Sequence, residues 1–137
     1  MPATQIVTKE VYVFDSALPE LQKLIDAVSA SGTDSKIIIL KSDSDGVLQL
    51  ASALVGESNL DAIHIFSHGS VGSLQLGSTF LDSFSLPGYS DALEQIGKVL
   101  EADGDLLLYG CNVAQGEFGR EFIELLASAT RDRKSVV

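Results

Sequence analysis

The stretch Ile63-His64-Ile65-Phe66-Ser67-His68-Gly69 decides the fold, together with a later stretch of the same kind, Leu106-Leu107-Leu108-Tyr109-Gly110-Cys111. Each stretch is mainly apolar and has no Asp, Glu, Lys or Arg, which is typical of a strand buried on both faces of a parallel sheet. Each ends at a side chain that can act as a base or a nucleophile, beside a glycine. Because ligands and catalytic groups collect at the carboxyl ends of such strands, we expect His68 and Cys111 to lie at one edge of the sheet.

Strand patterns and helix patterns alternate along the rest of the chain, which predicts βαβ crossovers. We expect strands at residues 10–14, 36–40, 62–67 and 105–109. We expect a helix capped by Ser16, a helix capped by Asp43 or Asp45 on which Val55 faces inward, and a helix after Pro87-Gly88. A last helix is expected near Gln115, in which Phe118 and Leu125 have helical spacing. A small hairpin is expected from residues 73–76 and 79–81. The predicted fold class is α/β, a three-layer α/β/α sandwich with a mostly parallel sheet, truncated at the C-terminal end by at least one strand.

The length of 137 residues and the apolar share of 45% are those of one globular domain. Helical periodicity ends near Ala129, so we expect residues 1–130 to form the domain. The remaining segment, 131–137, can be encoded by a DNA sequence that looks like read-through into a sequencing adapter. We therefore expect 131–137 to be a non-native tail and the natural protein to continue.

Charge and motif content exclude several classes of function. The 19 acidic and 9 basic residues give a net charge of −10, which argues against nucleic acid and anionic membranes as partners. One cysteine forms no internal disulfide, and no apolar run of about eighteen residues predicts a membrane span. The N-terminus lacks the pattern of a Sec signal peptide. Since nucleotide-binding loops and a sufficient set of metal ligands are also missing, no cofactor and no metal are expected.

The two strand ends favour cysteine chemistry. A thiol attacks only as thiolate, which a neighbouring imidazole and the N-terminus of the following helix both favour. The alternative is a packing role, because free Cys is among the most buried residue types and a histidine at a strand end is often only hydrogen-bonded. His64 lies inside the sheet, so we expect it to be a hydrogen-bonded core histidine.

Two families resemble this chain. Ser67-His68-Gly69 after one strand and Tyr109-Gly110-Cys111 after the next resemble the caspase-like (clan CD) cysteine peptidases. More closely, the chain resembles the domain-of-unknown-function family 4347, met near the N-terminus of very large secreted, adhesin-like bacterial proteins. The stretches that carry this second resemblance are 45–47, 60–65, 67–69, 74–77 and 106–114.

The resemblance to the peptidases implies a role for each matching residue. His68 would be the base or acid, Cys111 the nucleophile, and the backbone N–H groups of Gly69 and Cys111 would bind the oxyanion. The implied function is peptide hydrolysis, with a peptide segment of its own chain as one partner, in a secreted or cell-surface protein. The alternative is a catalytically inactive structural or interaction module of the same large protein.

Overall fold

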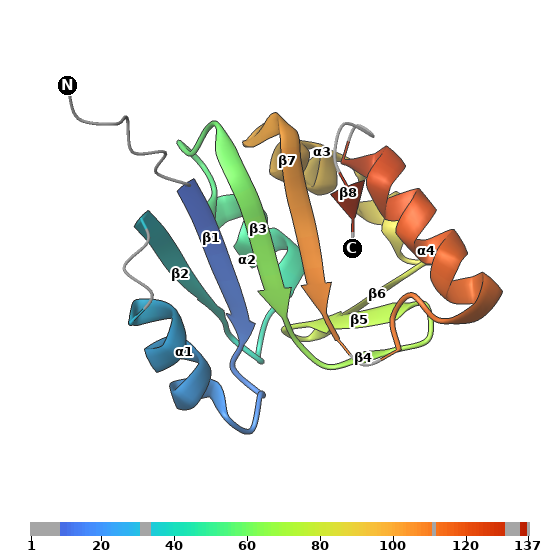
Figure 1. Ribbon diagram of the computed structural model, residues 1–137. Helices are drawn as coiled ribbons and strands as arrows, with labels where there is room; N and C mark the ends of the chain where they lie inside the picture. Colours follow the sequence, from blue (N-terminus) through green and yellow to red (C-terminus); the bar gives the residue numbers. More distant parts are fainter. Residues whose placement is uncertain (1–8, 31–33, 111, 131–134, 137) are drawn as a thin grey trace.

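The computed structural model describes residues 9–30, 34–110, 112–130 and 135–136, which form a parallel sheet with helices on both faces (Figure 1). The strand order is β2-β1-β3-β7-β8, and every pairing in this sheet is parallel. Its strands are β1 (Lys9–Asp15), β2 (Asp34–Leu40), β3 (Leu60–Phe66), β7 (Leu100–Tyr109) and β8 (Ser135–Val136). The prediction of a three-layer α/β/α sandwich is confirmed.

The helices divide between the two faces of the sheet. They are α1 (Leu21–Ser29), α2 (Gly46–Ala53), α3 (Ser90–Lys98) and α4 (Gly116–Ala129), with a 3₁₀ turn at Leu86–Tyr89 before α3. Figure 1 shows α1 in front of the sheet, α2 and α3 behind it, and α4 alongside α3. Within the described part of the chain, no helix is long and apolar enough to span a bilayer.

A second, antiparallel sheet lies where β3 and β7 end, below their arrowheads in Figure 1. It contains β4 (Gly69–Ser70), β5 (Ser73–Leu76) and β6 (Thr79–Asp82), so the predicted hairpin is confirmed with one additional strand. Its β5–β6 turn fits tightly against the start of α2, since a Cβ on Gly77 would lie 2.3 Å from the Ser44 carbonyl oxygen. Gly77 also has a φ of +61°, a conformation that glycine adopts without strain.

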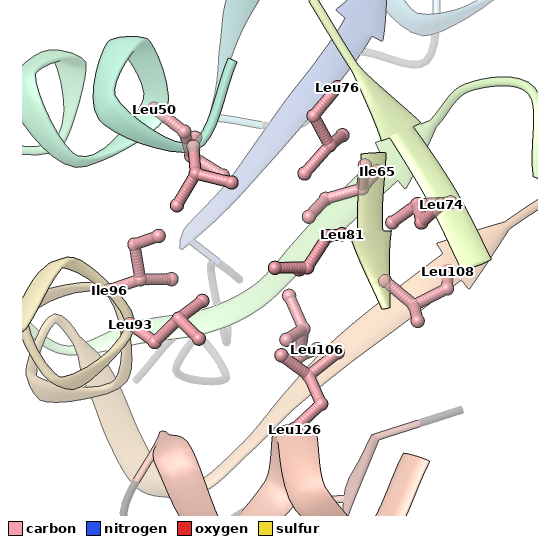
Figure 2. A pocket seen from close by; sticks show the side chains of 11 residues that line it. Leu50, Ile65, Leu74, Leu76, Leu81, Leu93, Ile96, Leu106, Leu108 and Leu126 are labelled. Atoms are coloured by element: carbon pink, nitrogen blue, oxygen red, sulfur yellow. The ribbon is translucent and has the colours of Figure 1, made fainter. Parts of the chain in front are cut away.

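The core lies between the back face of the sheet, the helices behind it and the hairpin. Aliphatic side chains from all three surround a cavity of about 20 Å³, as Figure 2 shows for Leu50 of α2, Leu76 of β5 and Leu126 of α4. This lining offers no polar side chain to hold a water molecule or a ligand. The cavity is therefore a packing space, and the hairpin is part of the core.

Two predicted helix features are wrong. Ser16 does not cap α1, which begins at Leu21; the Ser16 hydroxyl bonds that of Ser42 at 2.8 Å. Val55, expected to face inward, is 76% exposed, and Phe118 and Leu125, which have helical spacing with core residues of α4, are 74% and 37% exposed. Both errors have one cause, because contacts with distant segments decide where a short helix starts and which of its sides is covered.

Candidate functional site

The ends of β3 and β7 lie side by side. In this parallel pair Phe66 is opposite Tyr109, and the Ser67 N–H donates to the Tyr109 carbonyl at 3.4 Å. A Cβ on Gly110 would lie 3.4 Å from the Gly69 Cα, so the two glycines that follow these strands approach closely. The segment after β3 and the segment after β7 therefore share one edge of the sheet.

Cys111 lies outside the described residues, so its roles as nucleophile and as backbone donor stay predictions. The chain on either side of it is described. Gly110 packs against Val113, and Asn112 has a φ of +60°, which marks a sharp turn before α4. The Gln115 N–H donates to the Asn112 carbonyl at 3.1 Å and closes this turn.

His68 is exposed at the same edge, with its ring directed toward the loop after β1. Its Nε2 donates to the Ala17 carbonyl at 3.4 Å. Because a carbonyl oxygen only accepts hydrogen bonds, this contact places the proton of the neutral ring on Nε2 and leaves Nδ1 as the basic nitrogen. The main chain thus sets the orientation of the His68 ring.

Asp15 holds the loop that orients His68, and the sequence analysis missed it. Its carboxylate is 1% exposed and accepts from the Ala17 N–H at 2.9 Å and from the Gly77 N–H at 2.8 Å. One buried side chain thus joins the loop after β1 to the β5–β6 turn. A signal was present, because Asp15 ends an apolar strand just as His68 follows one.

The Gly69 N–H takes no part in the β4–β5 ladder. The Gln75 N–H donates to the His68 carbonyl at 2.9 Å, which makes Gly69 and Leu74 a non-hydrogen-bonded pair of the antiparallel ladder. In such a pair the N–H groups point away from the partner strand. The Gly69 N–H therefore points away from β5.

A hollow of about 230 Å³ opens beside His68. Its lining residues are His68, Gly69, Ser70, Ser73, Gln75 and Phe80. Ser67 directly precedes His68 in the chain, but its hydroxyl is buried and has no hydrogen-bond partner among the described residues. The hollow has room for a substrate side chain next to the candidate base.

His64 is a hydrogen-bonded core residue, as the sequence predicts. It is 8% exposed, its Nε2 lies 2.6 Å from Glu10 Oε1, and its Nδ1 lies 3.0 Å from the Tyr109 hydroxyl. The ring also stacks on Tyr12 with centroids 4.3 Å apart. Burial, followed by the charge of Glu10, raises the pKa of Tyr12 above its ordinary value. His64 thus stabilises the packing on the front face of the sheet.

Asp45 joins the start of α2 to the segment before α3. Its carboxylate accepts from the N–H groups of Val47 and Leu48 and from the Tyr89 hydroxyl, so it is the N-cap that the sequence offered as one of two choices. Burial opposes its ionisation, but these hydrogen bonds outweigh burial and lower its pKa. The same contact with Asp45 raises the pKa of Tyr89.

Comparisons with known proteins identify the family of the chain. A flavoprotein in complex with FMN from Lactobacillus acidophilus is similar in structure at 14% sequence identity, with a TM-score of 0.48, 96% of this chain covered and 91% of that one. No curated protein matches the chain significantly. Residues 11–134 match the family described as Domain of unknown function (DUF4347). Since this match spans most of its length, the chain belongs to the DUF4347 family.

Proposed function

We propose that this domain is a cysteine-dependent peptide hydrolase in which Cys111 is the nucleophile and His68 moves its proton. The adjacency of β3 and β7 carries the proposal. Phe66 is opposite Tyr109 in these neighbouring parallel strands. His68 is the second residue after Phe66, and Cys111 is the second residue after Tyr109. Such residues emerge at one edge of a sheet, where a thiol and an imidazole can exchange a proton.

The proposed reaction uses Nδ1 of His68 as the proton carrier. Nδ1 takes the proton of the Cys111 thiol, and the thiolate attacks the carbonyl carbon of the peptide bond. The carbonyl electron pair moves to oxygen, which accepts from the N–H of Gly69. When the tetrahedral species collapses, the C–N bond breaks and the amine leaves with the proton from Nδ1. A water molecule then hydrolyses the thioester, giving the acid and restoring the thiol.

The surroundings of His68 suit this role. The Ala17 carbonyl fixes which ring nitrogen carries the proton, and buried Asp15 fixes Ala17. A base oriented in this manner loses little freedom when the transition state forms. Removal of a positioned general base costs about 10²–10⁴-fold in rate.

The proposed context is a large secreted bacterial protein of the adhesin type, in which the domain cleaves its own chain. The family resemblance drawn from the sequence supports this context. A non-catalytic module of the same protein is the competing possibility. The two differ in one measurable property, the reactivity of the Cys111 thiol.

The test exploits the fact that Cys111 is the only cysteine of the chain. Alkylation by iodoacetamide, followed by intact-mass spectrometry, reports on this thiol alone. We expect fast alkylation at neutral pH and hydrolysis of a fluorogenic peptide mixture by the wild type. In His68→Ala both rates fall, hydrolysis by about 100-fold or more, and in Cys111→Ala both vanish.

Ser52→Ala is the control, because Ser52 is exposed on α2 and does not line the hollow beside His68. Its rates are expected to equal those of the wild type. If the wild type and His68→Ala are alkylated at equal rates and neither hydrolyses peptides, the peptidase proposal is overturned. The non-catalytic interaction module is then the function that remains. If the full-length parent protein is processed identically with and without Cys111→Ala, self-cleavage by this domain is excluded.

A further inference from the structure

A second hollow, of about 410 Å³, lies between the hairpin and α4. We name it the α4 groove and define it by six of its lining residues. They are Val71, Asp82, Phe84, Phe118, Glu121 and Leu125. The four apolar members are all exposed, Phe84 at 95% and Phe118 at 74%. Exposed apolar side chains gathered around one hollow mark a binding surface rather than ordinary scatter.

The α4 groove is built by rigid elements on both sides. Phe118, Glu121 and Leu125 form a stripe along one side of α4, at the spacing of helix neighbours. The β4–β5 turn forms the floor, since the Gly72 N–H donates to the Val113 carbonyl at 2.9 Å. A Cβ on Gly72 would lie 3.0 Å from the Phe118 carbonyl oxygen, so the turn and the helix are in close contact.

The charge of the groove indicates what it binds. Asp82 and Glu121 are its charged lining residues, both acidic. The described part of the chain contains no salt bridge to either. Asp82 uses Oδ1 for the N–H groups of Phe84 and Ser85, which leaves Oδ2 for another donor. Two phenylalanines and two carboxylates suit a Lys or Arg side chain, through cation–π contact and charge pairing, beside a bulky apolar residue.

The α4 groove and the hollow beside His68 share a lining residue. Ser73 lines both the groove and the hollow beside His68. A peptide that places a side chain in the groove can therefore extend toward His68. We infer that the α4 groove selects peptide segments in which a basic residue adjoins a bulky apolar one. As a substrate preference this rests on the proposed function, whereas the binding itself does not.

Binding is tested with the full chain carrying Cys111→Ala, so that no peptide is cleaved. Fluorescence anisotropy compares four labelled peptides in a Gly-Ser background, with Leu-Arg, Leu-Gln, Leu-Glu or Ser-Arg at the centre. We expect the Leu-Arg peptide to bind most tightly and the Leu-Glu peptide to bind about tenfold or more weakly. High salt should reduce the ratio of these two affinities, because it screens the charges. Equal affinity for Leu-Arg and Leu-Glu overturns the inference.

Protein variants locate the binding. Phe118→Ala and Phe84→Ala each weaken Leu-Arg binding about tenfold, and Glu121→Gln about threefold. The matched controls are Val55→Ala, at an exposed apolar residue in the turn after α2, and Glu124→Gln, at an exposed acid of α4 outside the groove lining. Controls that weaken binding as much as Phe118→Ala, with unchanged thermal unfolding, overturn the inference.

The two proposals fail separately. If Leu-Arg binds in the groove but wild-type chain cleaves no peptide, the peptidase proposal fails and the groove remains as a peptide-binding site. If wild-type chain cleaves peptides without preference for the basic residue, and groove variants leave cleavage unchanged, the groove fails and the peptidase remains.

Discussion

His64 on β3 and Glu10 on β1 form a short hydrogen bond across neighbouring strands, with Nε2 2.6 Å from Oε1. A carboxylate only accepts, so Nε2 donates to Glu10, and Nδ1 is hydrogen-bonded to the Tyr109 hydroxyl at 3.0 Å. Three adjacent strands are thus joined by one imidazole. Tyr109 is the last residue of β7, two positions before Cys111. Its hydrogen bond with His64 therefore also fixes the end of β7.

Removal of the Tyr109 hydroxyl is expected to be mild. Tyr109→Phe keeps the stacking on Phe66 at a centroid distance of 4.1 Å and loses one hydrogen bond, at about 0.5–1.5 kcal/mol. His64→Ala loses both bonds and the stacking on Tyr12, at about 2–3 kcal/mol. Urea unfolding followed by circular dichroism measures both. A cost for His64→Ala no larger than for Tyr109→Phe would contradict the assigned contacts.

Asp15→Asn is expected to destabilise the fold and to release His68. An amide can accept from the Ala17 N–H, but its NH₂ group then faces the Gly77 N–H, so two donors meet in a buried place, at about 1–3 kcal/mol. Because these two donors repel, the Asn side chain shifts and its hold on the Ala17 loop weakens, which frees the His68 ring. ¹⁵N NMR of the imidazole detects this as a mixture of tautomers. Asp43→Asn, at an exposed position, is the control. An unchanged His68 spectrum in folded Asp15→Asn would show that Asp15 does not orient the ring.

Asp45 makes stability depend on acid pH. Its pKa is lowered in the folded state, so the unfolded chain binds more protons at acid pH, and the stabilisation is present above the unfolded pKa and lost as the pH falls through the folded pKa. At neutral pH, Asp45→Ala costs about 1–2 kcal/mol through loss of the N-cap. Urea midpoints of wild type and Asp45→Ala should converge when the pH is lowered from 6 to 3. Asp45→Asn, which still caps α2, separates the cap from the charged contact with Tyr89.

Ser67→Ala is expected to be neutral or slightly stabilising. The Ser67 hydroxyl is buried without a partner in the described residues, and its removal relieves an unsatisfied polar group of about 1 kcal/mol. Thermal unfolding measures the change. A loss above about 1 kcal/mol would mean that the hydroxyl bonds a group outside the described residues.

The sequence predicts the strands of the central sheet well, because Ile63–Phe66 and Leu106–Tyr109 are apolar runs that only a covered parallel sheet accommodates. It also predicts the hairpin, where Gly77 marks the turn. Periodicity alone predicts the wrong start of α1, because the Asp15 carboxylate binds the Ala17 N–H and holds the chain in a turn at that point.

The candidate site is predictable only in part. His68 and Gly69 are found because chemistry-bearing residues and glycine follow an apolar strand. Asp15 is missed because its second partner, Gly77, is distant in sequence and is brought close only by the hairpin. The α4 groove is missed because Phe118 and Leu125 have the spacing of core residues, and spacing does not reveal that the hairpin covers only part of α4.

The pairing of Phe66 with Tyr109 also sets the order of events during synthesis. A growing chain that has emerged only as far as the hairpin carries His68 but has no β7 beside it. The ribosome must release the third helix and the strand after it before this edge can close, because translation runs from the N-terminus at about 5–20 residues per second. Under the proposed peptidase function, a nascent domain is inert for that interval, and neighbouring unfolded segments of the same polypeptide are spared from premature cleavage.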